Sequence, residues 1–165
     1  MGLYTDGAPD LHKATIIPRG PAGGLTMFLP DDRTMVSRKQ LLAQLDMMMG
    51  GRVAELLVYG EDETTTGAIN DLQQATALAT RMVTQYGFSD KVGQRFVSVE
   101  DQAHMSDADR TVVDQETRAL LQGAFGRARD ILTRRRKELG LLASALVERE
   151  TLTVEEIKDA VGYTA

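Results

Sequence analysis

The chain has 165 residues, a length typical of one domain, and is 42% hydrophobic and 26% charged, as expected of a globular protein. Its net charge of −5 provides no general basic footprint for nucleic acid, and the absence of cysteine excludes disulfides and thiolate metal sites. No apolar run in the sequence approaches the roughly 20 residues that cross a bilayer.

The first third of the chain contains all four prolines, and its pattern predicts a small sheet. Two short runs have the composition of strands, at residues 13–17 and 25–29. Pro18 and Gly20 end the first run, residues 21–24 are predicted to form a loop, and Pro30 closes the second run. We therefore expect a small sheet with an exposed edge.

From Ser37 onward the pattern is helical. Ser37 and Gln40 have the spacing of a capping box, in which two side chains bond the first free backbone N–H groups of a helix. Apolar residues then recur at helical spacing until Gly60. Gly50 and Gly51 should interrupt this helix, because glycine costs about 1 kcal/mol relative to alanine in a helix. Such a pair favours close packing of another backbone.

Further helices are predicted at residues 68–86, 107–136 and 139–148, and Gly87 is placed to terminate the first of them. Thr153 and Glu156 have the spacing of a second capping box, which predicts a short last helix. The stretch 90–105 is poorly patterned and is predicted to be a loop. The fold class is therefore mainly α with a small β-sheet near the N-terminus. We expect one domain over residues 1–165, with a β-containing part at 1–36 and a helical part at 37–165.

Asp71 lies near the start of the predicted second helix. Taken alone, an acidic residue there is typical of a first turn favoured by the helix dipole. Its surroundings, Thr64-Thr-Thr-Gly-Ala-Ile-Asn-Asp71-Leu-Gln-Gln-Ala-Thr76, resemble the third-ligand helix of the FtsH-type ATP-dependent zinc metalloproteases. The resemblance implies that Asp71 supplies the carboxylate of a His, His, Asp zinc site. Three such ligands leave a fourth position open for the water that zinc acidifies.

Other blocks resemble the same family in the same order, and the resemblance covers nearly the whole chain after residue 10. They lie at residues 11–20, Gly24-x-Thr26-x-x-x-Pro30, 49–55 with 59–60, 84–93, 114–116 and 150–152. The family has a helical peptidase domain. Its active-site edge strand corresponds to the second predicted strand, which implies that Leu25, Thr26, Met27 and Phe28 bind substrate.

Glu55 marks a departure from the family pattern. The family usually has two consecutive acidic residues after the alanine of Gly-Gly-Arg-x-Ala, whereas Glu55 is followed here by Leu56. We therefore interpret Glu55 as a candidate supporting residue behind the zinc ligands, and not as a ligand or a catalytic group.

The His-Glu-x-x-His motif of the family does not occur in the chain, so no catalytic residue is assigned. His12 and His104 lack ligand spacing and are interpreted as a locally bonded and a solvated histidine. The family places the motif just ahead of the region matching Leu3. Met1-Gly2 is interpreted as an expression start, which predicts a motif removed by truncation and an inactive 165-residue chain. The alternatives are a natural relative without a protease site that serves as an assembly subunit, or a generic helical interaction module.

The resemblance also implies the nature of the parent protein. It would hold zinc, use ATP and Mg in an ATPase domain outside this chain, assemble as a homo- or hetero-hexamer, and degrade unfolded or misassembled polypeptides. Its only contact with the membrane would be an anchor that is also outside this chain. The sequence of residues 49–54 and 82–87 most resembles the mitochondrial i-AAA branch of the family. This resemblance implies a location in the mitochondrial inner membrane, with the chloroplast thylakoid and the bacterial inner membrane as alternatives.

Overall fold

The computed structural model describes residues 1–18, 23–29 and 35–164, and it is mainly helical with a small antiparallel sheet. The elements in chain order are η1 (Gly2–Tyr4), β1 (Leu11–Thr15), β2 (Leu25–Phe28), α1 (Arg38–Met48), α2 (Gly50–Tyr59), η2 (Thr66–Ala68), α3 (Ile69–Thr84), α4 (Val99–Ala103), α5 (Asp107–Arg134), α6 (Arg136–Arg149), β3 (Thr151–Thr153) and α7 (Val154–Val161). The predicted fold class is confirmed. The turns predicted at Gly20, Pro21 and Pro30 lie outside the described residues.

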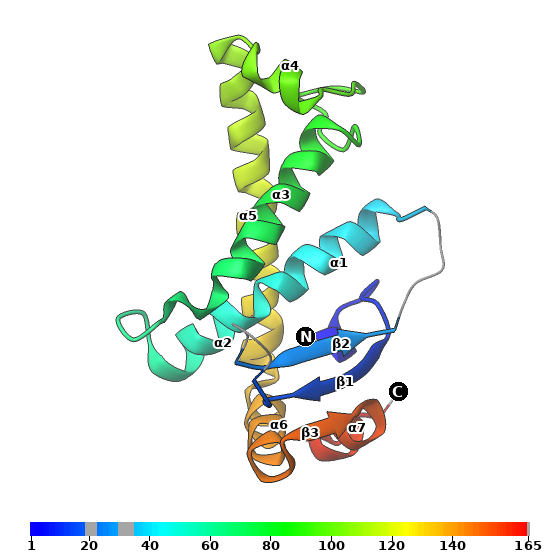
Figure 1. Ribbon diagram of the computed structural model, residues 1–165, viewed down its shortest axis with the longest axis vertical. Coiled ribbons are helices and arrows are strands. Elements are labelled where there is room, and N and C mark those ends of the chain that lie inside the picture. Colours follow the sequence, from blue (N-terminus) through cyan, green and yellow to red (C-terminus); the bar gives the residue numbers. More distant parts are fainter. Residues whose placement is uncertain (19–22, 30–34, 165) are drawn as a thin grey trace.

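The long helix α5 runs through the molecule and packs against several other helices, and α3 lies beside it (Figure 1). The short helix α4 caps the far end of this pair, whereas the sheet, α6 and α7 gather at the other end (Figure 1). Helices α1 and α2 both pack against α5. Within the described ranges, no helix has both the length and the apolar character needed to cross a membrane.

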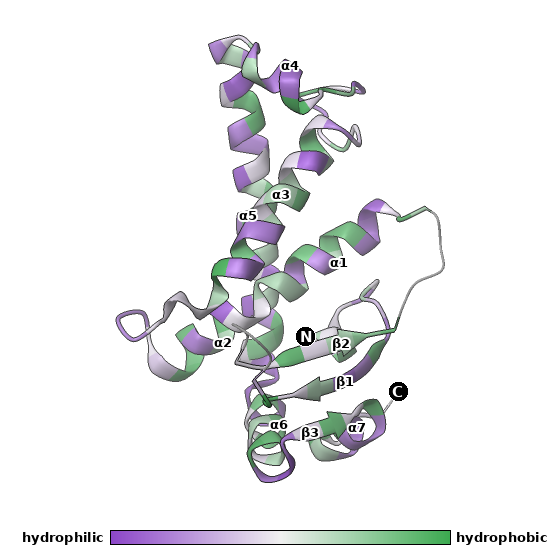
Figure 2. Ribbon diagram, in the orientation of Figure 1, coloured by the Kyte–Doolittle hydropathy of each residue, from purple (hydrophilic) through white to green (hydrophobic). Residues whose placement is uncertain are grey.

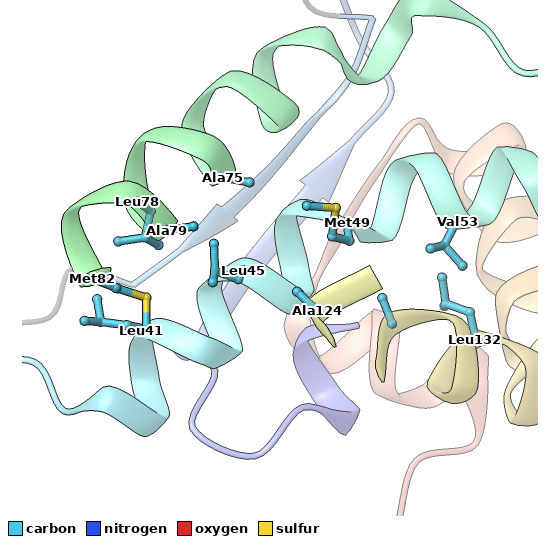
Figure 3. Packing of buried hydrophobic residues seen from close by; sticks show 11 residues of the cluster. Leu41, Leu45, Met49, Val53, Ala75, Leu78, Ala79, Met82, Ala124 and Leu132 are labelled. Carbon is cyan, nitrogen blue, oxygen red and sulfur yellow. The ribbon is translucent and has the colours of Figure 1, made fainter. Parts of the chain in front are cut away.

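The main core lies where α1 and α2 meet α3 and α5 (Figure 3). It contains four alanines on α3 and α5, whose small side chains allow close approach of the helices. The buried members are Leu41, Leu45, Met49, Val53, Ala75, Leu78, Ala79, Met82, Ala124, Ala128 and Leu132. Leu41, Leu45 and Val53 of the apolar pattern predicted up to Gly60 lie in this core. The helix predicted there is divided at Met49 into α1 and α2.

The sheet has the strand order β2-β1-β3, and both pairings are antiparallel. Ala14 of β1 lies opposite Thr26 of β2 and Leu152 of β3. The sequence predicted strands only within residues 1–36, so β3 is a correction. Its three residues carry no strand pattern of their own and pair with a strand more than 130 residues earlier, which ties the two ends of the chain together.

The first strand also begins and ends earlier than predicted, at Leu11–Thr15 instead of residues 13–17. The backbone N–H of Ile16 still bonds the carbonyl of Glu150 at 2.9 Å. The next N–H, of Ile17, turns to the Oγ1 of Thr15 at 3.2 Å, which ends the ladder. Ile16 and Ile17 are exposed as a result.

Local signals predicted the helix ends well. The capping boxes at Ser37 and Thr153 are both formed, and α2 ends just before Gly60. The helices predicted at 107–136 and 139–148 correspond to α5 and α6, which meet at Arg135. The region predicted as a loop at 90–105 contains α4, which a capping box at Ser98 starts.

Candidate functional site

Asp71 lies in the first turn of α3, as predicted. The single turn of η2 leads directly into this helix, and Thr65 caps η2 by accepting a hydrogen bond from the backbone N–H of Gly67 at 3.1 Å. The carboxylate of Asp71 is half-buried, and this burial raises its pKa above the usual value. Among the described residues, no hydrogen bond reaches this carboxylate.

Two consecutive glycines of α2 lie beside the site. A methyl group on Gly51 would lie 3.9 Å from Oδ2 of Asp71, which is an ordinary contact distance. A methyl group on Gly50 would come within 2.8 Å of Cγ of Met1. Burial there also lowers the pKa of the Met1 amino group. Met1 and Asp71 therefore approach α2 at neighbouring positions.

Glu55 lies one helical turn after Gly51 and accepts hydrogen bonds from the segment that leads to Asp71. Its Oε1 accepts a hydrogen bond from the hydroxyl of Thr65 at 2.5 Å, and its Oε2 accepts one from the Thr65 backbone N–H at 3.3 Å. The guanidinium of Arg52 lies 3.6 Å from Oε2. The bond from the Thr65 hydroxyl is the main cause that lowers the pKa of Glu55, with Arg52 adding to it.

The described residues bring no other metal ligand to Asp71. No group of three or more His, Asp or Glu side chains that could hold a metal occurs in the described ranges. His12 is exposed on β1, and His104 is exposed with its Nδ1 3.0 Å from the carbonyl of Glu100. A carboxylate is a ligand type that zinc accepts, but the described side chains do not complete a ligand set around Asp71.

The strand β2 is an edge of the sheet, as predicted. It pairs with β1 on one side, and no described strand pairs with its other side. Gly24 permits this pairing, because a methyl group there would lie 2.9 Å from the carbonyl of Thr15. Leu25 and Thr26 are exposed, and Met27 and Phe28 are half-buried. The role of these residues in substrate binding stays a prediction.

Thr65 is the member of the site that the sequence did not indicate. A threonine two residues ahead of Gly67 is a usable signal for a helix cap. No local pattern predicts that its hydroxyl meets a carboxylate ten residues earlier, because the loop between α2 and α3 sets that contact. Figure 2 shows that this loop is lined by hydrophilic residues.

Comparison with known proteins gives consistent matches over nearly the whole chain. The family described as Peptidase family M41 matches residues 1–160. "ATP-dependent zinc metalloprotease FTSH 9, chloroplastic/mitochondrial" of Oryza sativa subsp. japonica is 49% identical over 98% of this chain and 20% of its own length. "Mitochondrial inner membrane i-AAA protease supercomplex subunit YME1" of Saccharomyces cerevisiae is 46% identical over 96% of this chain and 21% of its own. "ATP-dependent zinc metalloprotease YME1L1" of Homo sapiens is 46% identical over 96% and 20%. The chain spans about a fifth of the length of these relatives.

Proposed function

The chain belongs to peptidase family M41, and we propose that residues 1–165 form the peptidase domain of a membrane-anchored, ATP-dependent zinc metalloendopeptidase. The observation that carries this proposal is the position of Asp71. It is a half-buried carboxylate at the start of α3, near Gly51 of α2, in the segment that resembles the third-ligand helix of the family. The relatives named as zinc metalloproteases support the same conclusion.

Asp71 is the zinc ligand that this chain contributes in our proposal. The remaining ligands would be histidines in a segment of the parent ahead of the region matching Leu3. The positions of Met1 near Gly50 and of Asp71 near Gly51 support this arrangement, because they place the N-terminal residues and Asp71 beside consecutive residues of α2. A zinc ion held there would polarise the scissile carbonyl and acidify a bound water.

The edge strand β2 would hold the substrate. An extended polypeptide can add to Leu25–Phe28 through main-chain hydrogen bonds, which read backbone more than side chains. This mode suits an enzyme that receives unfolded or misassembled protein. The ATPase domain with its ATP and Mg, a homo- or hetero-hexameric assembly, and the membrane anchor belong to the parent in this proposal.

The proposed location is the mitochondrial inner membrane, which the name of the yeast relative supports. The rice relative and an Arabidopsis thaliana relative carry the names chloroplastic/mitochondrial, so the thylakoid is the alternative, together with the bacterial inner membrane.

Asp71→Ala in the parent protein tests the proposal. We expect casein degradation to be lost and ATP hydrolysis to be retained, because the substitution removes a proposed metal ligand and the proposed ATPase domain lies outside these 165 residues. Asp62→Asn, in the exposed loop before η2, is the matched control. Full proteolysis by the Asp71→Ala protein would remove this residue from the active site.

A second candidate function rests on the absence of His-Glu-x-x-His from these 165 residues. In that case the protein would be an inactive assembly subunit of the same family. The parent sequence immediately ahead of Leu3 decides between the two. A His-Glu-x-x-His motif there supports the protease, and its absence supports the assembly subunit. In either case we expect no casein digestion by the 165-residue chain, and chelator-sensitive digestion by it would overturn that expectation.

A further inference from the structure

The carboxylate of Glu55 has both of its oxygens engaged by one residue, Thr65. Oε1 accepts a hydrogen bond from the Thr65 hydroxyl at 2.5 Å, and Oε2 accepts one from the Thr65 backbone N–H at 3.3 Å. Hydrogen bonds to an ionised acceptor are roughly twice as strong as neutral ones. This double contact ties α2 to the end of the loop that leads from α2 to η2. The loop itself, between Tyr59 and Thr66, has no regular secondary structure.

Thr65 connects Glu55 to the turn that precedes Asp71. Its hydroxyl donates to Glu55 and accepts from the N–H of Gly67, so both of its hydrogen-bonding functions are used. Gly67 lies in η2, and α3 begins directly after η2. Glu55 therefore holds the chain at Thr65, two residues ahead of Gly67 and six residues ahead of Asp71, where η2 leads into α3.

Gly51 and Glu55 are four residues apart on α2 and so lie on one face of that helix. Glu55 contacts the start of the segment that leads to Asp71, and Gly51 lies against the Asp71 carboxylate itself. This face of α2 thus meets the segment at two points. A general-base role for Glu55 does not fit, because Thr65 and Arg52 already occupy its oxygens.

We propose that Glu55 is a positioning residue that orients Asp71 for metal binding by clamping Thr65 at the start of η2. This inference rests on the proposed function of Asp71 as a zinc ligand. It also accounts for the departure from the family pattern at Leu56, because the contact with Thr65 is made by the first acidic position, which this chain retains.

The test measures the zinc affinity of the full-length parent by competition with a chelating dye. Replacing a group that orients a metal ligand typically weakens affinity or activity by roughly 10- to 100-fold. We expect Glu55→Ala and Thr65→Val each to weaken zinc binding by that amount. Thr65→Ser, which keeps the hydroxyl, should bind zinc as the unmodified protein does. Glu63→Gln, an exposed acidic residue of the same loop, is the control and should change nothing.

The double variant Glu55→Ala, Thr65→Val provides the second readout. If the two residues act through one contact, it should bind zinc no more weakly than either single variant. Melting temperatures of all variants separate this effect from general unfolding. Unchanged zinc affinity in Glu55→Ala and Thr65→Val, or strictly additive losses, would overturn the positioning role. Failure of the proposed function is distinguishable, because Asp71→Ala would then keep both zinc affinity and proteolysis.

Discussion

Asp46 and Arg127 form a bidentate ion pair that joins α1 to α5. The Nε of Arg127 lies 3.0 Å and 2.9 Å from the two carboxylate oxygens, and its Nη2 lies 2.7 Å from Oδ1. Asp46 is only 5% exposed, in a helix face that is otherwise apolar. A charge so placed is tolerated only with a partner, because an unpaired buried charge is strongly unfavourable.

Arg127→Ala should therefore destabilise the protein. The buried Asp46 carboxylate would lose its partner, at a cost of about 1–3 kcal/mol. Urea denaturation of the 165-residue chain measures this as a lower midpoint. Arg118→Ala is the matched control, because its pair with Asp114 is exposed on both sides and should be worth almost nothing. Equal midpoints for the two variants would contradict the structural importance of the Asp46 pair.

Glu116 links α5 to the turn after α3. It lies 2.8 Å from the ammonium of Lys91 and accepts a hydrogen bond from the buried hydroxyl of Ser89 at 2.9 Å. The contact with Lys91 and then that with Ser89 lower the pKa of Glu116 below its usual value of 4.5.

A lowered folded-state pKa means that Glu116 stabilises the protein above its unfolded-state pKa, and that this contribution is lost as pH falls through the folded-state value. We expect Glu116→Gln to lower the melting temperature at neutral pH, and the difference from the unmodified chain to shrink below pH 4.5. Melting curves over this pH range measure it. A difference that stayed constant with pH would rule out an electrostatic origin.

The sequence predicted the parts of this fold that depend on neighbouring residues. Capping at Ser37 and Thr153 and the end of α2 at Gly60 follow from local backbone and side-chain bonding, so they were predictable. The Ser98 box of α4 was missed because it uses Asp101 in place of the usual Glu or Gln.

The remaining features depend on residues far apart in the chain. The strand β3 exists because β1 offers it a partner, and the burial of Asp46 depends on Arg127, which comes 81 positions later. At the candidate site, Asp71 and Glu55 were indicated by the resemblance to a family. The proximity of Asp71 to Gly51 and the contact of Glu55 with Thr65 depend on how α2 lies against η2.

Gly50 and Gly51 should respond differently to alanine. Alanine is favoured over glycine in a helix by up to about 1 kcal/mol. Gly51→Ala places its methyl group at an ordinary contact distance from Asp71, so this variant should be stabilised. Gly50→Ala would meet Cγ of Met1 at 2.8 Å, so the Met1 side chain must move and the gain should be smaller or reversed. Thermal melting of both variants tests the order, and a more stable Gly50→Ala chain would contradict it.

Asp71→Asn should separate stability from function. The half-buried carboxylate of Asp71 is desolvated, and no described residue bonds it, so the neutral amide should raise the melting temperature of the 165-residue chain at neutral pH. The same substitution in the parent should abolish casein degradation, because an amide is a poor replacement for a carboxylate ligand. The exposed Asp62→Asn should alter neither quantity. A residue retained for metal binding is expected to have these opposite effects, since functional sites commonly keep groups that reduce stability. A lower melting temperature for Asp71→Asn would instead mean that the carboxylate mainly stabilises the start of α3.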